Sequence, residues 1–121
     1  SELIDNCLAK NNKKIINILN ENNYTNDDCI LITRTFLNKS KRVLKLCENY
    51  EKNNNINLTI NSAKPPIFWK DKEITIKQLN KWKPRTIKKL IYKINDLELK
   101  IKKNFDNSIN FITDFILEQS T

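Results

Sequence analysis

Apolar residues recur at helical spacing along most of the chain, and the clearest run lies between residues 84 and 103. Spacings of i, i+3, i+4 and i+7 place six of them on one helical face: Ile87, Leu90, Ile91, Ile94, Leu97 and Ile101. Pro84 suits the first turn of such a helix, because the N–H that proline lacks has no partner there. The pattern therefore predicts a long amphipathic helix that begins near Pro84.

A shorter helix is predicted just upstream, between two interruptions by proline. Pro65 and Pro66 cannot continue a helix from the N-terminal side, so we expect this helix to start near Pro66. Pro84 ends it near Trp82 or Lys83. Its apolar positions form an initial cluster and then a run at every third residue: Ile67, Phe68, Trp69, Ile76, Leu79 and Trp82. The polar residues 70–73 between the two groups allow a kink.

The apolar spacing in the N-terminal half of the sequence predicts three more helices. Residues 1–10 and 15–22 show short amphipathic patterns, each followed by asparagines, which tolerate the left-handed cap conformation. Thr25 followed by Asp28 is typical of a capping box, and it starts a longer helix that ends at the asparagines 53–55. One face of that helix is apolar: Cys29, Ile32, Phe36, Val43, Leu44, Cys47 and Tyr50.

Residues 56–62 have a different period. Ile56, Leu58 and Ile60 alternate with polar residues, which is the spacing of a strand. A lone strand would have no partner in a helical chain, so we expect an extended loop here. A final helix follows Asp106, Asn107 or Ser108, any of which can cap it. Its apolar residues are Ile109, Phe111, Ile112, Phe115 and Ile116.

Together these elements predict an all-α fold, a single helical bundle of five or six helices joined by short loops. The 121 residues suit one domain with one core. We expect that core to include Ile32, Phe36, Leu44, Leu79, Trp82, Ile87, Leu90, Ile94, Ile112 and Phe115.

Positive charge is concentrated in one part of the chain. The net charge is +8, with 22 Lys and Arg against 14 Asp and Glu. Residues 64–103 hold thirteen of these cations and four carboxylates, a balance of about +9. A lysine-rich helix with interleaved aromatic residues is typical of nucleic-acid binding. The abundance of Lys, Asn and Ile is equally explained by A/T-rich codons, so the sequence leaves both explanations open.

The residue types exclude several kinds of catalytic site. Histidine and glycine are absent, which removes the commonest general base and metal ligand and any glycine-rich phosphate loop. The carboxylates are scattered, and helix capping accounts for Asp27 and Asp28. Cys7, Cys29 and Cys47 lack metal-site spacing and lie among apolar residues, as small core residues in a reducing compartment do. We expect no catalytic residue, no metal, no cofactor, no membrane span and a cytoplasmic location.

Three motifs carry a resemblance to a known family. They are Pro-Pro-Ile-Phe-Trp at residues 65–69, Gln-Leu-x-x-Trp at 78–82 and Asp-Leu-Glu-Leu-Lys-Ile-Lys at 96–102. In this order the chain resembles the C-terminal domain of the delta subunit of bacterial DNA polymerase III, a subunit of the clamp loader. The resemblance covers essentially the whole chain and is sharpest between residues 64 and 102. Many family members have glycine after the last lysine of the long helix, where this chain has Lys103-Asn104-Phe105.

The resemblance implies a collar domain, which joins delta to the gamma or tau subunits and to delta-prime in a circular pentamer. The pentamer loads the sliding clamp on primed DNA during replication. In the family the delta subunit is not an ATPase, and an N-terminal AAA+-like part contacts the sliding clamp. That part is absent here, and the missing starting Met suggests a fragment. The interface is expected on the helix near Pro66 and on the final helix, at Ile67, Phe68, Trp69 and Phe111. The alternative function is a generic basic helical domain that binds nucleic acid.

Primer-template DNA is expected to contact the end of the long helix. The family commonly carries an aromatic residue there, near where the template strand leaves the collar, and Phe105 is the matching residue. An aromatic ring beside lysines can stack with a base without sequence preference. The expected contacts are Phe105, Lys89, Lys93, Lys100, Lys102 and Lys103. The alternative for Phe105 is packing against the last helix, and core positions are expected for Trp69 and Trp82 because they continue apolar stripes.

Overall fold

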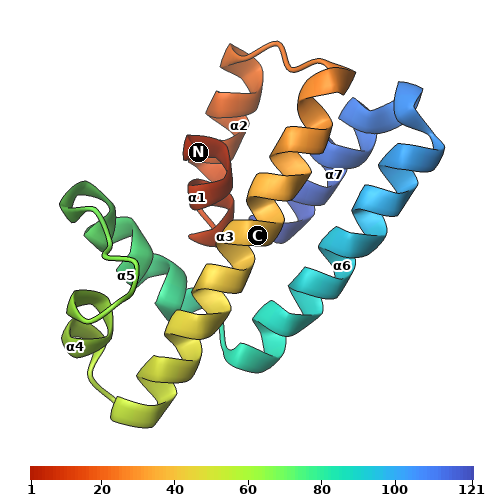
Figure 1. Cartoon of the computed structure of the whole chain (residues 1–121). Coiled ribbons are helices and arrows are strands. Elements are labelled where there is room, and N and C mark those ends of the chain that lie inside the picture. Colours follow the sequence, from red (N-terminus) through yellow and green to blue (C-terminus); the bar gives the residue numbers. More distant parts are fainter.

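Two long antiparallel helices form the centre of the fold (Figure 1). They are α3 (Asn26–Asn53) and α6 (Pro84–Lys103). Arg34 of α3 pairs with Glu98 near one end of the packed region, and the Cys47 thiol donates to the Trp82 carbonyl oxygen near the other. The computed structural model describes all of residues 1–121 and contains only helices, turns and loops, so the predicted all-α fold is confirmed.

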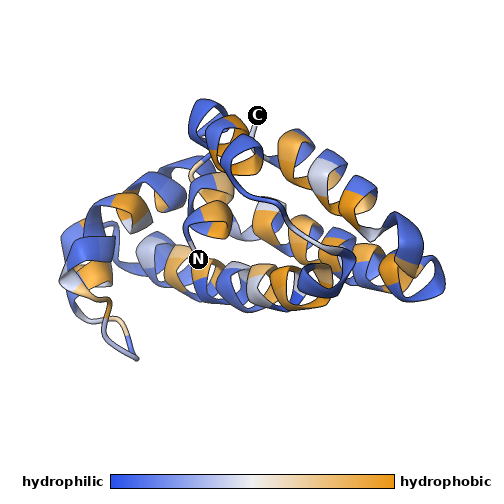
Figure 2. Ribbon diagram, turned by 90° about the horizontal axis from the view of Figure 1, so that it is seen from above, coloured by the Kyte–Doolittle hydropathy of each residue, from blue (hydrophilic) through white to orange (hydrophobic).

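Five shorter helices cover the sides of this pair: α1 (Glu2–Leu8), α2 (Asn12–Glu21), α4 (Ile56–Asn61), α5 (Lys72–Lys81) and α7 (Ser108–Gln119). Helix α7 packs against α1, α2, α3 and α6, whereas α4 and α5 lie beside the C-terminal end of α3. Short 3-10 turns, Trp69–Asp71 and Phe105–Asn107, precede α5 and α7. Hydrophobic residues lie on the sides of the helices that face one another (Figure 2).

The ends of the long helices follow from local sequence signals. Helix α3 begins at the predicted capping box, where the Thr25 N–H donates to Asp28 Oδ2 at 2.8 Å. It ends at Asn54, whose φ of 51° lies in the left-handed region that asparagine tolerates. Helix α6 begins at Pro84, as predicted, and Thr86 Oγ1 accepts the Lys83 N–H at 3.0 Å. These bonds pair backbone N–H groups that the helix leaves free.

The core contains most of the residues that the apolar stripes predict. Seven of the ten expected residues are buried: Phe36, Leu79, Trp82, Ile87, Leu90, Ile94 and Ile112. The other three, Ile32, Leu44 and Phe115, are half-buried and pack against that cluster. The Phe36 and Phe115 rings meet edge to face, with centroids 5.8 Å apart. The same core also includes Ile4, Cys7 and Leu8, so the short α1 is an integral part of the bundle.

Trp82 forms a junction between the two halves of the chain. Its indole Nε1 donates to the Leu8 carbonyl oxygen at 2.7 Å, which pairs one of the last free carbonyls of α1. Lys10 Nζ lies 4.3 Å from the centroid of the Trp82 ring and donates to the Gln119 carbonyl oxygen at 2.9 Å. The C-terminal end of α7 carries the negative end of the helix dipole and attracts this cation, while partial burial lowers the pKa of the Lys10 ammonium. Trp82 is therefore a core residue, as predicted.

The expected extended loop at residues 56–62 is wrong, because this segment forms the helix α4. Asn55 caps it through its side-chain oxygen, which accepts the Leu58 N–H at 3.0 Å. Ile56 and Ile60, four residues apart, face the core, while Leu58 stays exposed. Three alternating apolar residues thus fit a short helix as well as a strand, because in the helix only two of them need to face the core. This helix raises the number of α-helices to seven, above the predicted five or six.

Candidate interaction surfaces

The segment between α4 and α5 forms an exposed aromatic loop, which we define as residues Pro65 to Trp69. The helix expected to start near Pro66 begins only at Lys72, because the chain through the two prolines is extended up to Phe68, whose φ and ψ are −59° and 136°. Arg42 of α3 holds the loop by donating from Nη2 to the Pro65 carbonyl oxygen. At its far end the Asp71 N–H donates to the Phe68 carbonyl oxygen at 2.8 Å.

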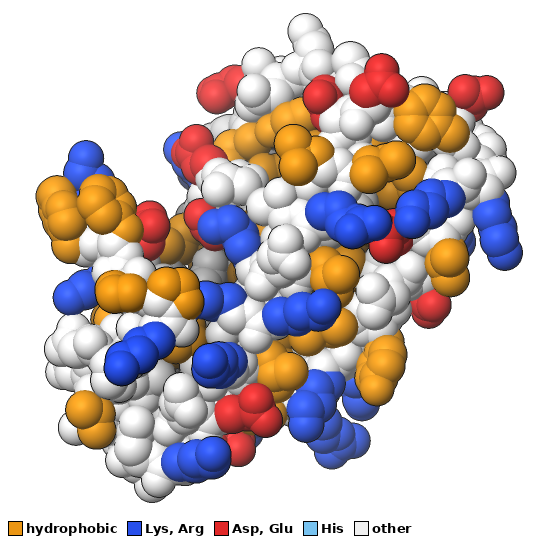
Figure 3. Space-filling model, viewed as in Figure 1, with side chains coloured by type: hydrophobic (Ala, Val, Ile, Leu, Met, Phe, Trp, Pro, Cys, Tyr) orange, Lys and Arg blue, Asp and Glu red, His pale blue; other side chains and the backbone are white.

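Two large aromatic side chains are exposed on this loop. Phe68 is 57% exposed and Trp69 is 69% exposed, and their ring centroids are 5.9 Å apart. The core position expected for Trp69 is therefore wrong: with no helix here, no apolar stripe carries the ring inward. Lys70 Nζ lies 5.4 Å from the centroid of the Trp69 ring. Figure 3 shows a hydrophobic projection with a basic side chain beside it, over the segment that precedes α5.

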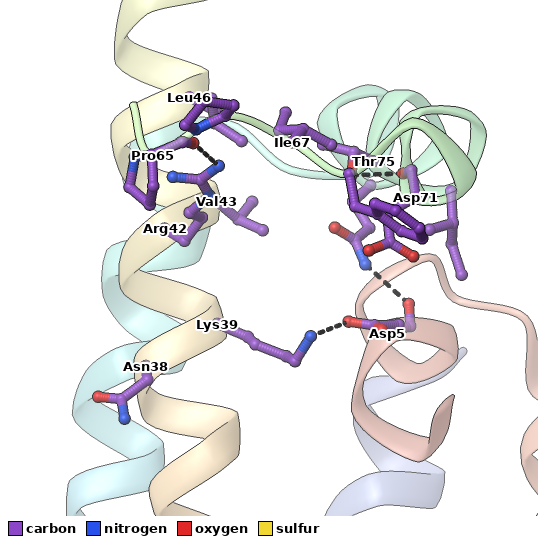
Figure 4. A pocket seen from close by; sticks show the side chains of 14 residues that line it. Asp5, Asn38, Lys39, Arg42, Val43, Leu46, Pro65, Ile67, Asp71 and Thr75 are labelled. Carbon is purple, nitrogen blue, oxygen red and sulfur yellow. Dashed lines mark hydrogen bonds and ion pairs between the residues drawn. The ribbon is translucent and has the colours of Figure 1, made fainter. Parts of the chain in front are cut away.

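A cavity of about 400 Å³ lies behind the aromatic loop, between α1, α3 and α5 (Figure 4). The loop residues Ile67 and Phe68 line one side of it. On another side Lys39 of α3 donates to Asp5 Oδ1 of α1 at 2.8 Å, so these two charges neutralise each other. The half-buried Ile67 turns toward this cavity, whereas Trp69 is not among the residues that line it.

The second predicted site lies at the opposite end of the bundle. Phe105 begins the 3-10 turn that links α6 to α7 and is 39% exposed, so it is partly packed and partly accessible. The turn is held by Ser108 Oγ, which donates to the Phe105 carbonyl oxygen at 2.5 Å. The Asn26 side chain joins it to α3 by donating to the Asp106 carbonyl oxygen at 3.4 Å. These two hydrogen bonds hold the backbone of the turn, and therefore the position of Phe105.

The five lysines proposed beside Phe105 do not form one cluster. Lys89, Lys93 and Lys100 are spaced i, i+4 and i+11 along α6, on the flank where Lys100 Nζ lies 5.4 Å from the Phe111 ring of α7. Lys102 lies on the other flank, 3.9 Å from Glu98, which also pairs with Arg34 of α3. Lys100, Lys102 and Lys103 all lie in the last turn of α6, close to Phe105 in the chain, whereas Lys89 and Lys93 lie further back along the helix.

The four proposed subunit-interface residues also lie on two separate surfaces. Ile67, Phe68 and Trp69 share the aromatic loop. Phe111 lies on α7, where it is half-buried and packs against the core. Its ring is covered on one side by the Lys100 side chain. The structure thus brings three of the four residues together, and the fourth belongs to a separate surface.

Sequence reasoning missed two features of these surfaces. Arg42, which anchors the aromatic loop, carries no motif, because its role depends on a carbonyl oxygen 23 residues away. Tyr92 of α6, which carries no motif either, is 72% exposed. Its position three residues after Lys89 and five before Leu97 is the signal that could have placed it off the apolar stripe.

The three cysteine thiols are buried and form no disulfide bond. All three cysteines are free thiols in the interior, as predicted for small core residues. Burial raises the pKa of Cys7 to about 12 and that of Cys47 to about 11, the latter with a contribution from Glu51 and Glu48. The structure has no group of three or more His, Cys, Asp or Glu residues placed to hold a metal ion. None of its helices is both long enough and apolar enough to cross a bilayer.

Comparisons with known proteins identify no relative: no family model, no curated protein and no solved structure matches this chain.

Proposed function

We propose that this chain is an assembly domain, the collar of a delta-type subunit in a bacterial clamp loader. The proposal joins the three motifs of the sequence resemblance to one observation, the two large aromatic side chains exposed on the loop between α4 and α5. A protein in solution gains no stability from exposing Phe68 and Trp69 side by side. Aromatic residues in such positions are enriched in protein interfaces, where they act as anchors.

The aromatic loop is held in place by a hydrogen bond and by its prolines, which supports an interface in which the backbone moves little on binding. Arg42 holds the Pro65 carbonyl oxygen from α3, and the two prolines limit the backbone conformations that must be lost on binding. The cavity of about 400 Å³ behind the loop adjoins Phe68 and offers room for a side chain of the neighbouring subunit. The partners under this proposal are the collar domains of gamma or tau and of delta-prime, and the domain acts by binding, without catalysis.

The test is size-exclusion chromatography with light scattering of this chain mixed with each collar domain at micromolar concentration. We expect co-elution with at least one partner and its loss in Phe68→Ala/Trp69→Ala, since removing two interface anchors commonly lowers affinity by about 100-fold or more. Leu31→Ala is the matched control, because Leu31 is 71% exposed on α3, away from the loop. Absence of co-elution with every partner, or equal loss in the control, would contradict the proposal.

A second candidate function, contact with primer-template DNA, is favoured by the accessible part of Phe105. Phe105 follows Lys102 and Lys103 in the chain at the end of α6, where its ring could stack with a base of a strand passing the bundle. Phe105→Ala should weaken binding of single-stranded DNA by about fivefold or more and leave its salt dependence unchanged, because stacking releases no counterions. Lys102→Gln/Lys103→Gln should instead lower the salt dependence.

Thermal unfolding separates this function from simple packing. A Phe105→Ala variant that unfolds at a much lower temperature, and binds DNA normally while folded, would assign Phe105 to packing of the last helix. A variant that keeps its stability and loses affinity would support the stacking contact.

A further inference from the structure

We propose that the outward face of the first half of α6 is a binding site for single-stranded nucleic acid, separate from both surfaces described above. The site consists of Arg85, Lys88, Lys89 and Tyr92, spaced i, i+3, i+4 and i+7. This spacing puts the four side chains on one stripe, opposite the buried stripe that contains Ile87, Leu90 and Ile94. All four side chains are exposed.

The stripe forms one wall of a shallow hollow of about 550 Å³. The remaining lining residues are Glu51 of α3 together with Lys83 and Pro84, which lead into α6. The hollow therefore holds four cationic side chains and one carboxylate. Figure 3 shows basic side chains gathered over this end of α6.

Arg85, Lys88 and Lys89 form no ion pair within the protein, although Glu51 lies in the same hollow. The ion pairs of the structure use Lys14, Arg34, Lys39, Lys102 and the N-terminus, and none of them involves Arg85, Lys88 or Lys89. Like charges three and four residues apart on a helix repel one another and destabilise it. Cations at the first turn of a helix also face the positive end of its dipole. The arrangement works against folding and suits an anionic partner, which would relieve both effects.

Tyr92 identifies which kind of polyanion fits. The ring is 72% exposed, the most exposed aromatic side chain of the protein, and it lies about one turn beyond Lys88 and Lys89. An acidic peptide would use the cations and leave the ring unused. A single strand would use both, because its phosphates meet the cations while a base stacks on the ring. Apart from Pro84 and Tyr92, every residue that lines the hollow is charged, so it offers little to an apolar anchor of a protein partner.

The dimensions agree with a short stretch of strand. Arg85 and Tyr92 are seven residues apart, which is about 10 Å along the helix axis. Stacked nucleotides advance about 3.4 Å each, so the stripe covers about three phosphates. Phe105 lies beyond the far end of α6, which is 20 residues or about 30 Å long. The two nucleic-acid contacts can therefore be removed independently.

The experiment measures fluorescence anisotropy of the whole chain with a labelled oligothymidine and, in parallel, a labelled oligoglutamate of equal length, over a salt series. Lys88→Gln/Lys89→Gln should weaken oligothymidine binding and lower the log–log salt slope by about 1.4, at about 0.7 for each phosphate contact of a single strand. The matched control is Lys13→Gln/Lys77→Gln, two exposed lysines on α2 and α5. The control should change the slope little.

Tyr92→Ala should weaken binding by about tenfold with an unchanged salt slope, and Tyr92→Phe should retain binding because it keeps the stacking face. Equal losses in the two lysine variants would mean that general positive charge binds the strand and would overturn the site. Oligoglutamate binding as tight as oligothymidine binding, with no effect of Tyr92→Ala, would overturn it in favour of an acidic protein partner. Co-elution with collar domains should be unaffected by Tyr92→Ala, so failure here is distinguishable from failure of the assembly function.

Discussion

The two tryptophans of this protein have opposite environments although they lie only thirteen residues apart. Trp82 is 7% exposed, donates from Nε1 to the Leu8 carbonyl oxygen and carries Lys10 on its ring. Trp69 is 69% exposed and contacts its neighbours Phe68 and Lys70. Trp69 directly follows Ile67 and Phe68, and Trp82 lies three residues after Leu79, so both continue an apolar pattern of the sequence. The difference separates a residue that holds the fold together from one that is available to a partner.

The largest expected effect is the loss of stability on removing the buried ring. Trp82→Ala should lower the free energy of unfolding by about 3–5 kcal/mol, because it leaves a cavity and removes the donor that pairs the Leu8 carbonyl oxygen at the end of α1. Urea denaturation followed by circular dichroism measures the change. A loss below about 1 kcal/mol would mean that the Trp82 junction contributes little to the fold.

Alkaline pH should weaken the same junction through the two thiols beside it. Cys47 donates to the Trp82 carbonyl oxygen, and burial raises the pKa of Cys7 to about 12 and that of Cys47 to about 11, from 9.0. Above pH 9 the unfolded chain loses these protons and the folded chain keeps them, so ionisation stabilises the unfolded state. Each thiol should lower the free energy of unfolding by about 1.4 kcal/mol per pH unit between pH 9 and its folded pKa.

The measurement is the urea midpoint from pH 8 to pH 10.5. Stability should be constant up to about pH 9 and should fall above it. Cys7→Ala should be less stable at pH 8, and its stability should decline less steeply at higher pH. An identical decline in the variant and the unmodified chain would show that the Cys7 thiol is not the group responsible.

Removing the cation at the junction should have a smaller effect. Lys10→Gln should lower stability by about 1 kcal/mol, since it ends the cation–π contact with Trp82 and the charged hydrogen bond to the Gln119 carbonyl oxygen. Lys13→Gln, an exposed neighbour on α2, is the control and should change stability by less than about 0.5 kcal/mol. Thermal melts of the two variants provide the comparison, and equal midpoints would contradict the assigned role of Lys10.

The smallest effect on stability is expected for the exposed tryptophan. Trp69→Phe should change the free energy of unfolding by less than about 0.5 kcal/mol, because the ring is mostly in contact with water. Iodide quenching of fluorescence gives a direct check, since the chain has two tryptophans. Trp69→Phe should remove the quenchable component and leave the blue-shifted emission of Trp82. Equal quenching before and after the substitution would place Trp69 inside the protein.

The resemblance to the delta-subunit collar rests on the same stretch of sequence that carries this contrast. Pro-Pro-Ile-Phe-Trp includes the exposed ring, and Gln-Leu-x-x-Trp includes the buried one. Under the proposed function the first motif belongs to the subunit interface, and the second belongs to the packed helices that hold the interface in position. Gln78 of the second motif contributes to this packing, since its side chain donates to the Asp5 carbonyl oxygen of α1 at 2.9 Å.

Elements with two independent local signals were predicted at their observed positions. Helix α3 has the Thr25 capping box and an apolar stripe, and α6 has Pro84 and an apolar stripe. Helix α4 had only three alternating isoleucine and leucine residues, a pattern that fits a strand or a two-turn helix. Helix α5 was expected to start too early, because a proline pair stops one helix without specifying where the next begins.

The sequence by itself determined the helical class, the residues of the two long apolar stripes and the buried state of the three thiols. Periodicity carries that information, because a helix of 20 or 28 residues can bury only the face on which its apolar residues recur. The tertiary structure alone decided which aromatic residues stay outside. Trp69 and Tyr92 are exposed because no other helix covers their positions, whereas the indole of Trp82 bonds the end of α1 and carries Lys10, which in turn bonds the end of α7. Such contacts join residues up to 109 positions apart, and no local pattern encodes them.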